Sequence, residues 1–180
     1  MAALIRQYFS EQTRGFADGI LLLDLPAPAL PAPDMREEER QLVADSVAHA
    51  SKKRAVQLIF DGTNDKTKLY LARHISEKLN RRLCHVSCTT LNNREDGDKV
   101  LSRLVSDAQN KQWILFFDEA DALFGKRTQV EDSHYKYANQ EVSYLLKLIT
   151  QFGGLAVFSC EEDDATQLLC RRFKNLIHCN

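Results

Sequence analysis

The sequence predicts an α/β fold in which a parallel sheet is covered by helices on both faces. Short apolar runs of strand length alternate with longer segments whose apolar residues recur at helical spacing, which is typical of such a sheet. One run, from Trp113 to Phe117, is apolar at every position, as in a strand buried on both faces. The chain has 180 residues, of which 44% are hydrophobic and 27% charged, and this suits one globular domain with a short appendage. The same composition excludes collagen-like, disordered and disulfide-scaffold proteins.

The N-terminal part of the chain is predicted to stand apart from the sheet. In residues 1–25 apolar side chains recur at helical spacing, so we expect a helical segment that docks on the main body or on a partner. Residues 26–33 hold all four prolines, which predicts an extended linker because proline fixes φ and removes a backbone donor. The α/β core is therefore expected to span residues 34–180.

The core is predicted to open with a helix and to continue as alternating strands and helices. Asp34 and Glu37 have the spacing of a capping box, in which an N-cap acceptor is matched by a carboxylate three residues on. Gly153 and Gly154 are expected to end the long helix that precedes them. Strands are expected at residues 55–60, 83–86, 113–117, 155–158 and 176–177, and the helices between them at residues 71–79, 101–108, 142–152 and 164–172.

Charge and cysteine content narrow the class of protein. A net charge of −1 and a pI near 6.5 give no strong signal for nucleic acid or a membrane surface. No stretch approaches 18 continuous apolar residues, so we expect no membrane span. Five cysteines without regular spacing indicate a reducing compartment, and we expect a cytoplasmic protein. Cys84, His85 and Cys88 do not match the ligand spacing of a zinc site.

The clearest chemical signal is a strand that ends in two carboxylates. Ligands of a parallel sheet sit at the carboxyl ends of its strands, and the apolar residues 114–117 deliver Asp118 and Glu119 to that edge. This is the Walker B arrangement, in which Asp118 would hold Mg²⁺, directly or through water, and Glu119 would orient and deprotonate an attacking water. The alternative is a strand followed by an acidic helix N-terminus, which the helix dipole favours.

The end of the first core strand has the elements of a P-loop in shortened form. A P-loop, G-x-x-x-x-G-K-[ST], wraps phosphate in backbone N–H groups and adds a lysine and a hydroxyl. Here Gly62-Thr63 precedes Lys66-Thr67, but the loop is two residues short and Asp65 replaces the second glycine. The Asp65 carboxylate would repel the negatively charged triphosphate. At a separation of about 4 Å, repulsion between two like charges costs about 1 kcal/mol of binding free energy in water and about 4 kcal/mol at a protein surface. We therefore expect ATP binding to be weakened by at least about tenfold, or lost.

Residues 118–127, with the sequence Asp-Glu-Ala-Asp-Ala-Leu-Phe-Gly-Lys-Arg, closely resemble the AAA+ ATPases of the classical AAA clade. Residues 137–146 strengthen the match. The resemblance implies a three-layer P-loop NTPase fold of AAA+ type, here with an N-terminal helical extension. It also implies an ATPase core for protein remodelling or assembly, which works among AAA+ ring subunits or as a homo-oligomer on a protein client. Residues 118–121 also spell the helicase DEAD box, but those helicases need two lobes, for which this chain is too short.

The resemblance assigns roles to the candidate residues, with ATP and Mg²⁺ as cofactors. Arg171 and Arg172 match the segment that supplies an arginine finger to a neighbouring subunit's γ-phosphate. A basic helix C-terminus, favoured by the dipole alone, explains these two arginines equally well. The implied phosphate-binding residues are Gly62, Thr63, Lys66 and Thr67, the implied metal ligands are Thr67 and Asp118, and the implied catalytic residues are Glu119, Arg171 and Arg172.

Three features depart from the family pattern. Glu161 stands where the family has a sensor asparagine, and a carboxylate cannot donate to phosphate unless it is protonated. Residues 89–97 hold no aromatic residue, although family unfoldases carry one in a pore loop there. The sequence ends at Asn180, just after the last predicted strand, so we expect the family's helical lid to be absent. Two functions stay open, namely an ATPase core of weakened activity and a non-hydrolysing pseudo-ATPase that serves as an interaction or regulatory subunit.

Overall fold

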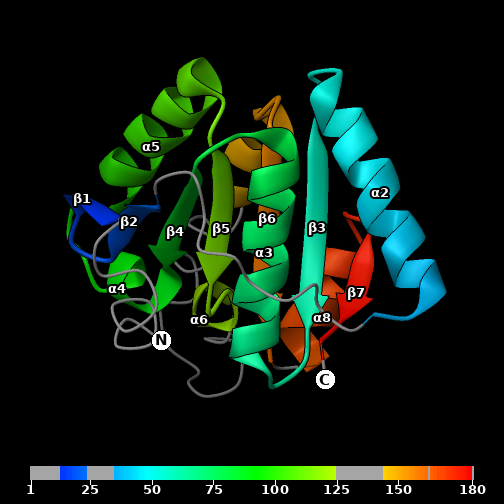
Figure 1. The fold of residues 1–180 in the computed structure, drawn as a ribbon. Coiled ribbons are helices and arrows are strands. Elements are labelled where there is room, and N and C mark those ends of the chain that lie inside the picture. Colours follow the sequence, from blue (N-terminus) through cyan, green and yellow to red (C-terminus); the bar gives the residue numbers. More distant parts are fainter. Residues whose placement is uncertain (1–12, 24–34, 125–143, 162, 180) are drawn as a thin grey trace.

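The structure, a computed structural model, describes residues 13–23, 35–124, 144–161 and 163–179. These residues form one seven-stranded sheet, in the spatial order β1-β2-β4-β5-β6-β3-β7 (Figure 1). The five strands from β4 to β7 in this order are parallel, whereas β1 and β2 form an antiparallel hairpin on the edge at β4. The strands are β1 Thr13–Ala17, β2 Ile20–Leu23, β3 Val56–Asp61, β4 Leu83–Ser87, β5 Ile114–Asp118, β6 Leu155–Cys160 and β7 Leu176–His178.

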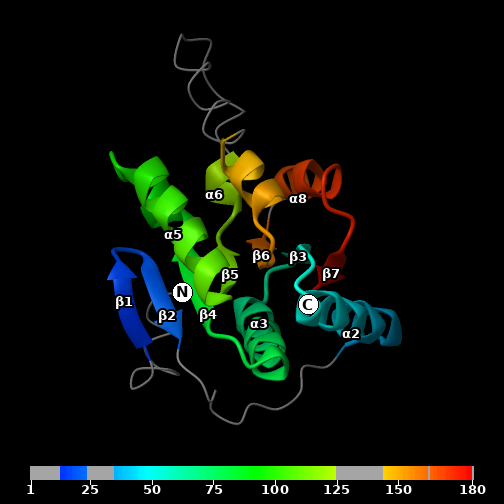
Figure 2. The ribbon, with the colours of Figure 1, turned by 90° about the horizontal axis from the view of Figure 1, so that it is seen from above.

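Helices cover both faces of this sheet and make the predicted three layers. Seen from above, α2 and α3 lie on one side, and α5, α6, α8 and the helical residues 144–151 lie on the other (Figure 2). The predicted α/β class is confirmed. The helices with defined bounds are α2 Glu37–Ser51, α3 Asp65–Leu79, α4 Cys88–Asn92, α5 Gly97–Lys111, α6 Asp121–Phe124 and α8 Asp163–Cys170.

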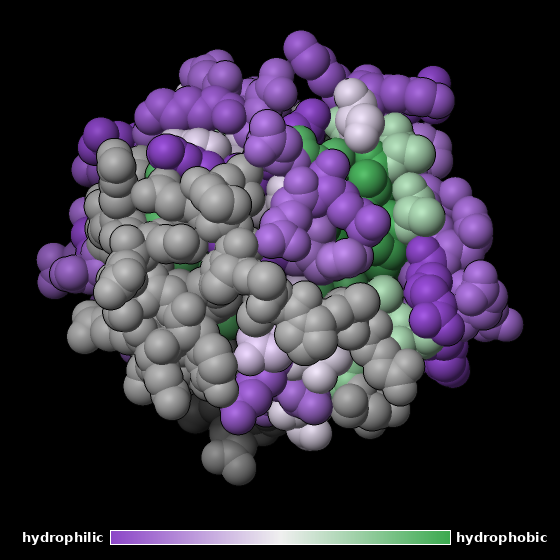
Figure 3. Space-filling view, in the orientation of Figure 1, coloured by the Kyte–Doolittle hydropathy of each residue, from purple (hydrophilic) through white to green (hydrophobic). Residues whose placement is uncertain are grey.

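Strand β5 shows how the two layers are held. Its side chains alternate, so Ile114 and Phe116 pack with the core under α2 and α3, while Leu115 and Phe117 pack with the core under α5. All five residues of the strand are buried, the first four as the continuous apolar run predicts and the fifth, Asp118, in addition. On the face of Figure 3, hydrophobic side chains also gather in a strip between α3 and α2.

The N-terminal segment differs from the sequence prediction. Residues 13–23, expected to be helical, form the β1–β2 hairpin instead. The apolar run Ile20–Leu23 pairs residue by residue with β4 and so extends the sheet, which satisfies backbone groups that an edge strand would leave open. Residues 1–12 and the predicted linker, 26–33, lie outside the described residues.

The first core helix begins two residues later than predicted. Helix α2 is capped at Arg36, whose backbone N–H donates to Glu39 Oε2 at 3.0 Å. Asp34, the predicted cap, lies outside the described residues. The short helix α4 after β4 was not predicted at all. In the part of the chain that is described, no helix is both long and apolar enough to cross a membrane.

Candidate functional site

The loop after β3 is closed by the backbone of the neighbouring strands. The N–H of Gly62 donates to Cys160 O at 3.2 Å, and the N–H of Cys179 donates to Asp61 O at 2.6 Å. Gly62 has φ +125°, and a Cβ placed there would lie 2.3 Å from the carbonyl oxygen of Cys179. Gly62 is therefore required by the close approach of Cys179, whatever else the loop does.

Asp61, the last residue of β3, ties the same loop to the C-terminal elements. Thr166 of α8 donates its hydroxyl to Asp61 Oδ1 at 2.9 Å. His178 of β7 lies with Nδ1 3.0 Å from Asp61 Oδ2. Both carboxylate oxygens of Asp61 thus have partners within the fold.

The N-terminus of α3 carries a side-chain cap. The Oδ1 atom of Asn64 accepts from the backbone N–H of Thr67 at 3.1 Å, so one of the amides that would face a phosphate already has an acceptor. Thr63 and Lys66 are exposed. Three of the four predicted phosphate-binding residues therefore lie at this helix start, but the helix is capped by the chain itself.

The buried cation of this region is Lys68, which the sequence analysis did not single out. The side chain is fully buried, and Nζ donates to Gly62 O at 2.8 Å and to Cys160 O at 3.2 Å. Nζ also lies 3.2 Å from Asp65 Oδ1 and 4.0 Å from Glu161 Oε1. The ammonium that reaches the loop thus belongs to Lys68, while the predicted lysine, Lys66, points to solvent.

Glu161 follows β6 and completes this group. Partial burial, a hydrogen bond with Asp65 and the negative charge of Asp65 raise the pKa of the Glu161 carboxyl above its ordinary value. Its backbone N–H donates to Asp121 Oδ2 at 2.9 Å. The position where the family has a sensor asparagine is therefore held between Asp65, Lys68 and Asp121.

The end of β5 is organised differently. Asp118 is buried, and its Oδ2 lies 2.9 Å from Nε2 of the buried His85 on β4. His85 Nδ1 is buried as well and has no hydrogen-bond partner among the described residues. Glu119 is exposed and adopts φ +55°, in the left-handed region that non-glycine residues rarely occupy. The two carboxylates are thus delivered to the same edge, but only Glu119 faces solvent.

The predicted arginine finger lies on the surface. Arg171 and Arg172 follow α8, and both side chains are exposed. Their backbone N–H groups close the last turn by donating to Gln167 O and Leu169 O. Their exposure is compatible with contact to a neighbouring subunit and equally with a solvated helix end.

These residues do not form a site that fits ATP with Mg²⁺. Such a site needs open amides, a free ammonium and an accessible carboxylate. Here the amides of Gly62 and Thr67 are bonded within the chain, Lys68 is engaged by four oxygens, and Asp118, the predicted metal ligand, is bonded to His85, although the exposed Lys66 and Glu119 stay accessible. Among the described residues there is no group of three or more His, Cys, Asp or Glu side chains placed to hold a metal ion.

The cysteines near His85 are poor candidates for metal ligands. Burial raises the pKa of the Cys84 thiol to about 12 and raises that of Cys88 well above its ordinary value. Metal ligation requires the thiolate, which such burial disfavours. The Nε2 atom of His85, between them in the sequence, is directed to Asp118 instead.

Sequence reasoning did not single out Lys68, and it considered His85 only as part of a zinc pattern, although each leaves a signal. Lys68 shares the helical spacing of Ala72 and Ile75, which places it on the buried face of α3. His85 lies inside a strand that is otherwise apolar, so it was bound to be buried and to need a polar partner.

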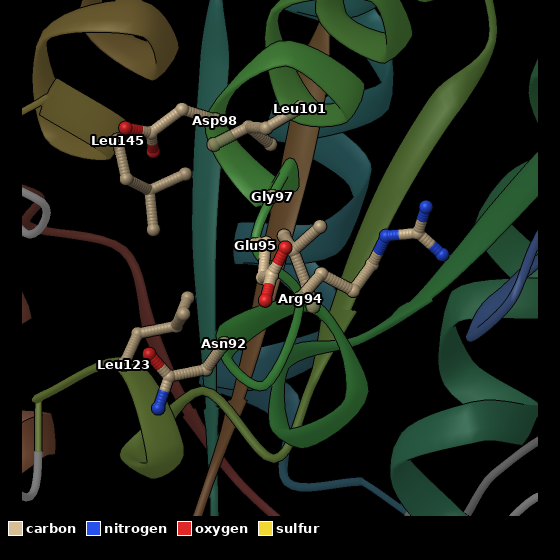
Figure 4. A pocket seen from close by; sticks show the side chains of 9 residues that line it. Asn92, Arg94, Glu95, Gly97, Asp98, Leu101, Leu123 and Leu145 are labelled. Atoms are coloured by element: carbon tan, nitrogen blue, oxygen red, sulfur yellow. The ribbon is translucent and has the colours of Figure 1, made fainter.

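A separate cavity of about 100 Å³ lies between the α4–α5 connection, α6 and residues 144–151 (Figure 4). Leu123 and Leu145 line one side, and the Arg94 guanidinium points away from them (Figure 4). Asn92 donates its side-chain N–H to Ala122 O at 3.3 Å and so fixes the wall next to α6. Pockets for drug-sized ligands measure about 300–1,000 Å³, so this cavity does not suit a nucleotide.

Comparison with known proteins identifies the family. The family model described as "ATPase family associated with various cellular activities (AAA)" matches residues 58–179. No curated protein matches the chain.

Solved structures of AAA domains share the fold. The FIGL-1 AAA domain matches with a TM-score of 0.62 and 16% identity over 81% of this chain and 53% of its own. The same domain in complex with ADP matches with a TM-score of 0.65 and 12% identity over 99% of this chain and 61% of its own. A structure on katanin self-assembly matches with a TM-score of 0.61 and 16% identity over 82% of this chain and 51% of its own. The chain thus spans about half to three fifths of the length of these neighbours.

Proposed function

Because the chain belongs to the AAA family of ATPases, a nucleotide-binding family, we propose that it acts as a non-hydrolysing subunit of an AAA assembly. In this role it binds neighbouring AAA subunits and a protein client through its surface, and it does not hydrolyse ATP itself. The observation that carries the proposal is the closed loop after β3. The amides of Gly62 and Thr67, which would have to face a phosphate, are bonded to Cys160 and Asn64.

Two further observations support a role through neighbours. Arg171 and Arg172 are exposed, which leaves them available to a nucleotide held by the next subunit. A katanin AAA domain of the same fold is described in a study of self-assembly. The described part of the predicted core, residues 35–124, 144–161 and 163–179, would be the body of this subunit, with the β1–β2 hairpin docked on its edge.

A second candidate function, a slow ATPase, is favoured by one observation. Glu119 is exposed beside Asp118 at the end of β5, where a general base for water would stand. In that role Thr67 and Asp118 would hold Mg²⁺ and Lys66 would meet the phosphates. The closed loop is the argument against it.

ATP turnover by the purified chain separates these two functions. The proposal expects no phosphate release above background with Mg-ATP, and no difference between wild type and Glu119→Gln. Turnover that Glu119→Gln abolishes would establish the slow ATPase instead.

The contribution to neighbours is tested on an AAA subunit that assembles with this chain. We expect the double variant R171A/R172A to lower that partner's ATP turnover by about 10³-fold or more if an arginine finger is lost. Lys174→Ala is the matched control, since Lys174 is an exposed cation of the same segment. Equal turnover with all three proteins would rule out the finger.

A further inference from the structure

Lys68 is a buried cation whose hydrogen-bonding capacity is met entirely by the chain. An ammonium has three donors, and Lys68 Nζ has three oxygens within 3.2 Å, from Gly62, Cys160 and Asp65. Glu161 adds a fourth oxygen at 4.0 Å. A buried charge is stable only when it is paired. Lys68 is already paired within the chain, so it needs no ligand to stabilise its charge.

The cluster around Lys68 lies at the carboxyl edge of the sheet, where a bound phosphate is expected. Its oxygens come from the ends of β3 and β6 and from the first turn of α3, which is where the family's nucleotide phosphates are expected. Two carboxyl groups, those of Asp65 and Glu161, lie within 4.0 Å of Lys68 Nζ, so the charge of the ammonium already has a counter-charge within the chain. A phosphate that entered here would displace one carboxylate and face the other.

We propose that Asp65 and Glu161 are an internal counter-ion for Lys68, which takes the place of bound phosphate and keeps the site free of nucleotide. This inference rests on the proposed function and adds its cause. It assigns Lys68 as the anion-attracting cation of the site, in place of Lys66, and assigns two carboxylates as the groups that hold anions out. Asp65 and Glu161 therefore act as positioning residues through Lys68.

Charge-neutral, isosteric variants test the proposal. In the double variant D65N/E161Q the amide oxygens can still accept from Lys68, but the ammonium loses its counter-charge. We expect this variant to bind inorganic pyrophosphate at least about tenfold more tightly than wild type in calorimetric titration, with wild type showing no binding at millimolar concentration. The matched control D45N/E77Q removes two exposed carboxylates from α2 and α3 and is expected to behave as wild type.

A third change shows whether the gain depends on Lys68. The triple variant D65N/E161Q/K68M is expected to lose the gained affinity, and its fold is verified by circular dichroism. If the triple variant does not fold, a tenfold loss of the gained affinity on raising the salt concentration takes its place, because an attraction of charges is screened by salt.

Two results would overturn the inference. One is micromolar binding of pyrophosphate or Mg-ATP by wild type that Lys66→Met abolishes, since Lys66 would then be the phosphate ligand. The other is unchanged affinity of D65N/E161Q. The second result leaves the proposed function intact, because the absence of turnover and the contribution to neighbours are measured separately.

Discussion

The two strand ends that carry nucleotide motifs in the sequence are closed in different ways. At the end of β3 the motif is degraded, and the loop is held by backbone bonds to β6 and β7 and by the buried ammonium of Lys68. At the end of β5 the motif is intact, but Asp118 is bonded to a single side chain, His85, and Glu119 remains exposed. The chain after β5 is also tied to β6, by the Ala120 N–H that donates to Ser159 O at 2.8 Å, so the difference lies in the side chains: Asp61 at the altered motif has two side-chain partners, Thr166 and His178, whereas Asp118 is bonded to His85.

This contrast teaches that an intact motif and an available site are separate properties. The residues of the shortened loop have acquired structural partners, so the loop serves the fold itself. The carboxylates after β5 keep the family's sequence, yet only one of them is accessible. Variants at each strand end show how firmly each closure is held.

The largest effect is expected at β5, from His85→Leu. Without His85 Nε2, the buried carboxylate of Asp118 loses its hydrogen bond, and breaking a buried polar pair in this way costs about 3 kcal/mol. Urea unfolding measures the loss. His74→Leu, on the partly exposed face of α3, is the matched control and is expected to change stability little.

The double variant H85L/D118L sharpens this result. When both polar partners are replaced by apolar groups, no unpaired carboxylate remains, so the loss is expected to be smaller than the sum of the two single losses. Additive losses would mean that the 2.9 Å contact between His85 and Asp118 does not couple them.

A smaller but still large effect is expected at β3, from Gly62→Ala. The new Cβ would lie 2.3 Å from Cys179 O at a φ of +125°, so the backbone of β7 or the loop must move. Forced left-handed backbone and overpacking together predict a loss of about 2 kcal/mol in the free energy of unfolding.

Gly153→Ala is the control for this substitution. Its Cβ would meet only the end of the flexible Gln109 side chain, at 3.1 Å, so a smaller loss is expected. Equal losses at both glycines would show that Cys179 does not constrain Gly62, and the structural account of that glycine would be wrong.

The layers and most elements of the fold were predictable from the sequence. The short apolar runs of β3, β5 and β6, that of β3 interrupted by Gln57, indicate strands buried on both faces, and the apolar face of α5 indicates its orientation. The hairpin was missed because residues 4–9 carry a helical spacing that masks the strand character of Ile20–Leu23. The run pairs with β1 across the Asp18-Gly19 turn, which is a local hairpin signal in the sequence, and with β4, 60 to 66 positions later, a pairing that local patterns cannot report.

The candidate site was predictable only in part. The sequence locates Asp118 and Glu119 at a strand end, and the structure places them there. The face of α3 on which a lysine lies decides whether that lysine is buried. The P-loop motif drew attention to Lys66, although the helical spacing places Lys68 on the buried face. The packing of Cys179 against Gly62 joins positions 117 residues apart, so the motif alone suggested a phosphate role for that glycine.

The smallest effect is expected from Glu119→Gly, and its sign is opposite. Glu119 has φ +55°, which costs a non-glycine residue about 1–2 kcal/mol, while the greater freedom of glycine in the unfolded chain takes back about 0.5–1 kcal/mol. The variant is therefore expected to be more stable than wild type by about 0.5 kcal/mol in urea unfolding. Gln112→Gly, at φ +57° after α5, is the matched control and is expected to gain about as much. If Glu119→Gly instead loses stability while Gln112→Gly gains it, the Glu119 side chain contributes to the fold, and the contrast between an embedded β3 end and an exposed β5 end must be redrawn.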